Sequence, residues 1–137
     1  MEYVDKIVNI ESSGNRFAKS SKGAVGLMQI TKPVVKDWNK DHPNDKHTMN
    51  DLTDPEINKK IGTWYWDEKI PEYLSNEGIP DNDLHRAAAY NWGIGKTSNW
   101  YDSGAGFSKL PEQTQNWYSK FIHADAPGFD SDREATY

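Results

Sequence analysis

The chain has 137 residues, with six Trp, seven Tyr, four Phe and no cysteine. This length can bury roughly two-thirds of the unfolded surface in one domain, and the missing thiols exclude disulfides, cysteine-ligated metals and thiol nucleophiles. The net charge of −5 argues against nucleic acid as a partner, because phosphate neutralisation requires clustered Lys and Arg. Since no apolar run approaches the roughly 20 residues of a membrane helix, we expect no membrane insertion.

Helical periodicity dominates the chain from its beginning. Val4, Ile7 and Val8 share one face of a predicted helix, and Glu11 continues that face. Further helices, each with a Thr, Asp or Pro start signal, are predicted over residues 31–38, 54–71 and 81–91 and from Pro111 onward. Five helices and few strand signals predict a mainly α fold.

Two internal segments without periodicity are predicted loops, residues 41–51 and 92–109, and a short β-hairpin is left open in either. Residues 1–123 then form a single domain, and residues 124–137 an acidic C-terminal tail or extension. The alternating acids of the tail, Asp130 to Glu134, lack the glycine of a calcium loop, and the four His are isolated. We therefore predict no metal and no other cofactor.

Glu11 is the first candidate for chemistry. If the carboxyl group is desolvated on the apolar face, its pKa rises and it keeps a proton available for general acid catalysis. If the helix frays after Ile10, Glu11 is an ordinary solvated side chain. Its position alone leaves both interpretations open.

The residues that follow Glu11 favour the catalytic interpretation. The chain reads Glu11-Ser12, then Ser20, then Gly-Ala-Val-Gly-Leu-Met-Gln-Ile over residues 23–30. This pattern closely resembles the lytic transglycosylase and goose-type lysozyme family. Three later stretches resemble further family motifs in the same order, and they are Asp54-Pro55 with Asn58 and Gly62, the run from Ala87 to Gly93, and Leu110-Pro111 with Thr114.

The resemblance implies a lysozyme-like fold whose N-terminal helix carries the catalytic residue, Glu11. It also implies a set of substrate-binding residues, Ser20, Gln29, Tyr90, Asn91 and Trp92. In the family, the tyrosine that corresponds to Tyr90 orients the catalytic carboxylate. Trp92 departs from the family, which commonly has a small residue there, and its ring is either a sugar platform or a core residue. In a second departure, Gln113 replaces the family's Glu, and Glu112 comes one position earlier.

The implied activity is that of a peptidoglycan lytic transglycosylase. Such an enzyme cleaves the β-1,4 bond between N-acetylmuramic acid and N-acetylglucosamine and leaves a 1,6-anhydro product, with Glu11 as general acid and then base. Because one carboxylate suffices for this reaction, the missing family Glu favours it over the two-carboxylate hydrolysis of a lysozyme. The alternatives are that lysozyme-type hydrolase and a non-catalytic glycan-binding module of a virion or secretion machine.

The same resemblance implies peptidoglycan glycan strands as the partner of a monomeric protein at the bacterial cell wall. The first residues lack the basic and apolar regions of a signal peptide, which favours a phage or another exporter-dependent source.

Tryptophan positions and charge add two expectations. Trp64 and Trp117 lie at core positions of predicted helices, whereas Trp92 and Trp100 are candidates for a substrate rim. Residues 1–40 carry seven bases and four acids, but residues 41–85 carry four bases and eleven acids. We therefore expect the catalytic side to be less negative than the whole protein.

Overall fold

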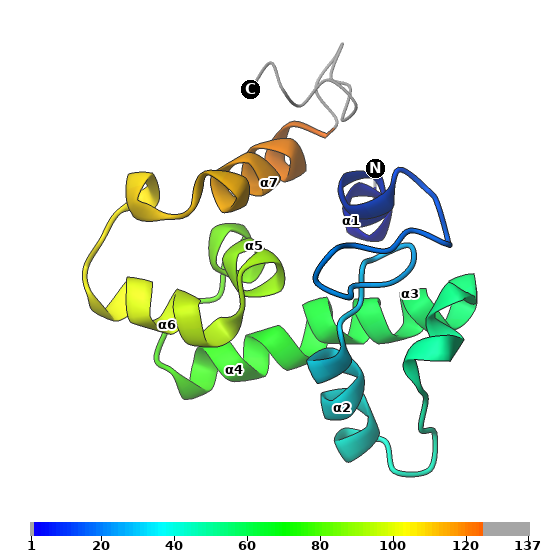
Figure 1. The fold of residues 1–137 in the computed structure, drawn as a ribbon. Coiled ribbons are helices and arrows are strands. Elements are labelled where there is room, and N and C mark those ends of the chain that lie inside the picture. The colour runs from blue at the N-terminus through cyan, green and yellow to red at the C-terminus, as the bar shows by residue number, and fades with distance from the viewer. Residues whose placement is uncertain (1, 125–137) are drawn as a thin grey trace. The chain divides into compact units, whose positions relative to one another are not determined.

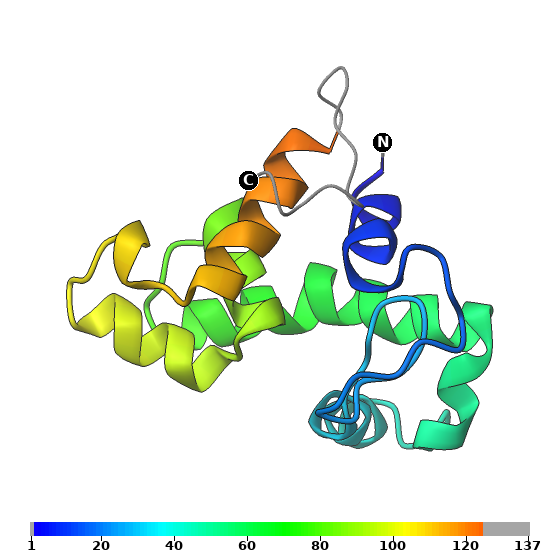
Figure 2. The same cartoon turned by 45° about the horizontal axis from the view of Figure 1, so that its top comes forward.

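The computed structural model describes residues 2–124, and helices dominate it (Figures 1 and 2). The expected mainly α fold is confirmed. The chain divides into two compact units, Met1–Tyr65 and Trp66–Tyr137. Among the described residues, no helix combines the length and the apolar character that a membrane span requires. The predicted tail, residues 124–137, lies almost entirely outside the described residues, and so do its alternating acids from Asp130 to Glu134.

The first unit contains four helical elements, α1 (Tyr3–Ser12), α2 (Lys32–Asp41), the short 3-10 helix η1 (Met49–Thr53) and α3 (Pro55–Trp64). Asp54 caps α3, because its Oδ1 accepts hydrogen bonds from the backbone N–H groups of Glu56 at 2.9 Å and Ile57 at 3.3 Å. The helix packs against α2 and η1. The core of the unit includes Trp64, as predicted, and the fully buried Ile61.

The second unit contains the rest of the helical elements, which are most of the π-helical η2 (Tyr65–Lys69), α4 (Ile70–Asn76), α5 (Asp83–Asn91), α6 (Ile94–Asp102), the 3-10 helix η3 (Phe107–Lys109) and α7 (Glu112–His123). Helix α5 contacts α4, α6 and α7, and lies between α6 and α7 in Figure 1. Its buried run of Ala87, Ala88 and Ala89 has only methyl side chains, which lets neighbouring helices approach closely.

Two predictions of local structure are wrong. Residues 92–109 are not simply a loop, because they contain α6 and η3. The two glycines near the start of α6 obscured its apolar spacing, although Gly93 serves as the N-cap with a φ of 108° and Gly95 is exposed. Pro71 does not end the third helix either, since it lies in the first turn of α4, where a missing N–H costs little.

The β-hairpin left open in residues 41–51 or 92–109 is absent from both segments. Within residues 2–124, extended pairing occurs as isolated antiparallel bridges, Lys19 with Val25 and Val25 with Ile30. The pairing therefore lies in the segment that carries the strongest sequence motif, where two tight turns bring the backbone together.

Candidate active site

Glu11 lies in the last turn of α1 and is half-buried. The helix does not fray after Ile10, because it continues through Ser12 and ends at Ser13, which is left-handed with a φ of 52°. The backbone N–H of Ser13 donates to the carbonyl of Asn9 at 3.2 Å. This closure fixes the backbone around Glu11, so the interpretation of Glu11 as a residue of a frayed end is wrong.

Ser12 connects the end of α1 to the motif loop, which we define as residues 18–30. Its hydroxyl Oγ lies 2.8 Å from the carbonyl oxygen of Leu27 and 3.1 Å from that of Val8, and it can donate its proton to either. The same oxygen accepts a hydrogen bond of 3.2 Å from the backbone N–H of Gly14. The residue next to Glu11 is thus tied directly to the Gly-Leu-Met segment.

Ser20 holds one turn of the motif loop. Its Oγ accepts hydrogen bonds from the backbone N–H groups of Lys22 at 3.3 Å and Ala24 at 3.0 Å, and the residue is exposed. Gly23 occupies the turn with a φ of 87°, a conformation that favours glycine. A role for Ser20 in sugar binding stays a prediction, and its structural role is to shape the loop.

Gln29 closes the other end of the motif loop. Its side-chain amide donates to the carbonyls of Ala18 and Gly26, both at 3.0 Å. These two bonds hold the residue in a left-handed conformation with a φ of 54°. Within residues 2–124, its Oε1 accepts no hydrogen bond, so one polar atom of this half-buried side chain remains available to a ligand.

Asn58 is the residue of this site whose role the sequence analysis missed. It is fully buried on α3, where its Oδ1 accepts a 2.8 Å hydrogen bond from the backbone N–H of Met28. Its Nδ2 donates to the carbonyls of Val25 and Leu52, both at 2.9 Å. Asn58 therefore binds the motif loop to α3 and η1, and its place in a family-like motif was the signal that could have assigned it this role.

Two glycines permit this close packing. Gly26 has a φ of 84°, and a Cβ atom there would collide with the Asn58 side chain and the Leu52 carbonyl. Gly62 on α3 leaves space for Met28, since a Cβ atom at Gly62 would lie 2.8 Å from Met28 Cε. A side chain at Gly26 would displace Asn58 or the Leu52 backbone, whereas a side chain at Gly62 would require the Met28 side chain to move.

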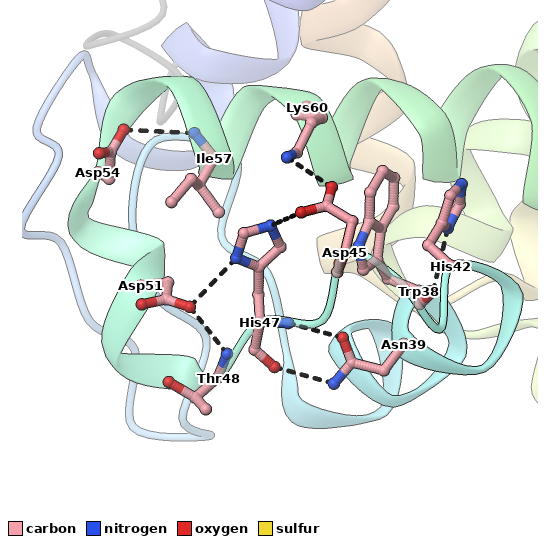
Figure 3. Close-up of polar contacts among 10 residues, drawn as sticks. All are labelled: Trp38, Asn39, His42, Asp45, His47, Thr48, Asp51, Asp54, Ile57 and Lys60. Atoms are coloured by element: carbon pink, nitrogen blue, oxygen red, sulfur yellow. Dashed lines mark hydrogen bonds and ion pairs between the residues drawn. The ribbon is translucent and has the colours of Figure 1, made fainter.

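A polar network supports the same unit from the side of α2 and η1 (Figure 3). The ring nitrogens of His47 lie 3.1 Å from Asp45 Oδ1 and 3.1 Å from Asp51 Oδ2. Lys60 Nζ on α3 donates to Asp45 at 2.8 Å, and this contact is the main reason why the pKa of Asp45 is lowered. The pKa of Asp51 is also lowered, mainly because its carboxylate accepts the backbone N–H of Thr48.

The second unit carries the remaining predicted residues on and after α5. Asn91 Oδ1 accepts a 2.8 Å hydrogen bond from Thr114 Oγ1 on α7, and Thr114 is almost fully buried. This contact joins two motifs that lie 23 residues apart in the sequence. Glu112 and Gln113, where this chain departs from the family pattern, are both exposed in the first turn of α7.

Tyr90 packs among tryptophans. Its ring centroid lies 5.8 Å from that of Trp66 and 5.8 Å from that of Trp117. Trp117 in turn stacks on Phe121, with the centroids 5.7 Å apart, so the prediction that Trp117 belongs to the core is confirmed. These contacts fix the plane of the half-buried Tyr90 ring.

The two tryptophans predicted for a substrate rim differ. Trp92 is half-buried and packs on the core cluster of Ala88, Trp100 and Leu110. Trp100 itself is buried, and its Nε1–H donates to the carbonyl of Gly106 at 3.0 Å. The indole of Trp100 is therefore mostly part of the core of the second unit, and a role for it at a substrate rim stays a prediction.

Comparison with known proteins gives consistent results. A family model described as Transglycosylase SLT domain matches residues 1–111. The membrane-bound lytic murein transglycosylase E of Buchnera aphidicola is 40% identical over 88 residues, which are 62% of this chain and 38% of that protein. The soluble lytic murein transglycosylase of Escherichia coli K12 is 33% identical over 105 residues, 76% of this chain and 15% of that protein. The chain thus spans well under half the length of these relatives.

Solved structures show the same similarity. The crystal structure of the 70 kDa soluble lytic transglycosylase of Escherichia coli matches with a TM-score of 0.65 and 28% identity, over 88% of this chain and 22% of that chain. An inactive mutant of lytic transglycosylase Slt from Pseudomonas aeruginosa matches with a TM-score of 0.70 and 20% identity, over 88% of this chain and 20% of that chain, which shows the fold alone.

Proposed function

Because the chain belongs to the Transglycosylase SLT domain family, we propose that it is a peptidoglycan lytic transglycosylase that cleaves the β-1,4 bond after N-acetylmuramic acid. The named relatives are murein transglycosylases, and the family-like motifs occur here in the same order, with departures at Trp92 and Gln113. Its substrate is then the glycan strand of the bacterial wall, and its place of action is the wall side of the cytoplasmic membrane.

The observation that carries this proposal is the 2.8 Å contact between Ser12 Oγ and the carbonyl of Leu27. It ties the helix end that carries Glu11 to the motif loop, which Asn58 in turn holds against α3. This contact holds the backbone that carries the Glu11 carboxyl group, and general acid catalysis requires such support, since proton transfer depends on a position held within hydrogen-bond reach.

The proposed reaction uses one carboxyl group twice. Glu11 donates its proton to the glycosidic oxygen while the bond from that oxygen to C1 of the muramic acid breaks. The resulting carboxylate then accepts the proton of the C6 hydroxyl, whose oxygen bonds to C1 and closes the 1,6-anhydro ring. No water is consumed, so no second carboxylate is needed, in agreement with Gln113 at the position of the family Glu.

The remaining predicted residues are proposed to bind the substrate. In the first unit these are Gln29, through its available Oε1, and the exposed Ser20. In the second unit they are Tyr90, Asn91 and Trp92, which aromatic packing and the Thr114 hydrogen bond hold in place.

Digestion of purified sacculi followed by mass spectrometry of the products tests this function. A lytic transglycosylase releases muropeptides with 1,6-anhydro ends, which are one water lighter than reducing ends. Reducing ends would instead identify the lysozyme-type hydrolase. If the protein binds sacculi but releases no product, the non-catalytic module replaces both enzyme interpretations.

A further inference from the structure

The second unit contains a pocket in which Trp92 is the one lining residue with a role proposed above. It has a volume of about 540 Å³ and lies between α6 and the segment that follows it. Trp92 and Trp100 line it together with four polar residues, Lys96, Asn99, Ser103 and Lys109. A pocket with aromatic walls and a few polar groups is the usual form of a small-ligand site.

The charged groups of this pocket have one sign, and its hydroxyl group, Ser103 Oγ, already donates a 2.7 Å hydrogen bond to the carbonyl of Trp100. The residues that line it include two lysines and no carboxylate. Within residues 2–124, neither Lys96 nor Lys109 forms an ion pair, and both are exposed. The side-chain amide of Asn99 is likewise exposed and makes no hydrogen bond within this part of the chain. The pocket therefore offers two cations and one amide to a ligand.

The aromatic walls set the second requirement on the ligand. Trp92 is held at the pocket because it packs against the buried Trp100 and Leu110, so its ring needs no reordering when a ligand arrives. Preorganised indole surfaces offer apolar contact area at little cost in side-chain entropy. A ligand that combines carboxylates, amide bonds and apolar groups therefore matches this pocket.

We propose that this pocket binds the carboxylate-bearing stem peptide of peptidoglycan, an inference that rests on the proposed function. A stem peptide carries free carboxylates, alanine methyl groups and amide bonds in a short length, whereas the neutral N-acetylglucosamine units of the strand carry no carboxylate. The lysines pair with the carboxylates, Trp92 covers the methyl groups, and Asn99 pairs with a peptide amide.

Binding is measured by calorimetry on the full chain with Glu11→Gln, which prevents turnover. The two probes are the disaccharide tetrapeptide with free carboxylates and the same compound with its carboxylates amidated. The free acid should bind about fivefold more tightly, because each exposed ion pair contributes up to a few fold in affinity. This preference should shrink as salt concentration rises.

Paired variants locate the effect. Adding Lys96→Met and Lys109→Met should remove the preference for the free acid, so that both probes bind equally. Adding Lys40→Met and Lys59→Met, two exposed lysines of the first unit, should leave the preference unchanged. The indole ¹⁵N signal of Trp92, identified by its loss in Trp92→Phe, should shift more with the free-acid compound than with the amidated one, and this difference should vanish when Lys96→Met and Lys109→Met are added.

Three results would overturn the inference. They are equal binding of the two probes by the Glu11→Gln protein, a preference that survives the loss of Lys96 and Lys109, and a Trp92 signal that shifts equally with the free-acid and the amidated probe. Sacculus digestion by the wild-type chain tests the proposed function separately. If binding depends on the carboxylates but the wild-type chain digests no sacculi, only the proposed function is refuted. If the chain digests sacculi but binds both probes equally, only the inference about the pocket is refuted.

Discussion

The backbone N–H of Met28 donates a 2.8 Å hydrogen bond to the side chain of Asn58, thirty residues later in the chain. The Asn58 amide also donates to Val25 and Leu52, so one buried side chain holds the motif loop, η1 and α3 together. Asn58 therefore holds in place the loop that Ser12, the neighbour of Glu11, contacts, and we assign Asn58 no part in the reaction itself.

Replacement of Asn58 by Ala should destabilise the protein strongly. The substitution leaves one N–H and two carbonyl groups without their partner in a fully buried place, and we expect a loss of about 3 kcal/mol in the free energy of unfolding. Urea denaturation measures this loss. The control is Asn44→Ala, at an exposed loop position, with an expected change within about 0.5 kcal/mol. Equal effects of the two substitutions would refute the role of Asn58.

The two motif-loop glycines should respond differently to Ala. Both have positive φ, 87° for Gly23 and 84° for Gly26, so both substitutions carry a similar conformational cost of about 1 kcal/mol. A methyl group at Gly23 meets nothing within 4 Å, whereas at Gly26 it meets Asn58 and the Leu52 carbonyl. Thermal unfolding should therefore show that Gly26→Ala is less stable than Gly23→Ala by about 2 kcal/mol. Indistinguishable melting temperatures would contradict the close packing.

Thr114 should act through Asn91. In Thr114→Val the hydroxyl that donates to Asn91 is lost, while Thr114→Ser keeps it. If Asn91 binds substrate, the valine variant should show a KM for solubilised glycan strands raised about tenfold, with the serine variant close to wild type. Steady-state kinetics with circular dichroism as a folding check measures this. A valine variant with wild-type KM would separate Asn91 from substrate binding.

Acid stability should depend on the contact between Lys60 and Asp45. Lys60 lowers the pKa of Asp45 in the folded protein, so its contribution to stability is present above the unfolded pKa of about 4 and is lost as pH falls through the folded value. Wild type should therefore exceed Lys60→Met in free energy of unfolding at pH 6, and the difference should narrow toward pH 2. Urea denaturation between pH 2 and pH 6 measures this difference, with Lys59→Met, at the neighbouring exposed lysine, as the control. A difference that does not change with pH would exclude this linkage.

The elements predicted best from sequence are those with local start signals. Asp54 caps α3, as predicted, through side-chain hydrogen bonds to N–H groups only two or three residues away. Helix α5 begins at Asp83, one of the two predicted starts, but its cap is Asn82, which was not predicted. Helix α6 was missed because its glycines are typical of loops. Whether they cap or interrupt a helix depends on the Trp100 packing that forms only in the folded chain.

The candidate site, like the fold, could be predicted from the sequence only in part. The motif indicated Glu11 as the candidate catalytic residue and the loop that follows it, because residue types and spacing carry that information. It did not reveal that the side chains of Ser20 and Gln29 form their hydrogen bonds with the loop backbone, nor that Asn58 holds this loop in place. Those roles depend on contacts between residues up to 33 positions apart, which spacing alone does not specify.

The most direct test of the account compares Glu11→Gln with Glu112→Gln in release of anhydro-muropeptides from purified sacculi. Loss of the general acid should lower the rate at least about a hundredfold in Glu11→Gln, with an unchanged unfolding curve. Glu112 is exposed in α7, and its replacement should change the rate by no more than about twofold. A Glu11→Gln protein that still releases anhydro products near the wild-type rate would show that Glu11 is not the general acid.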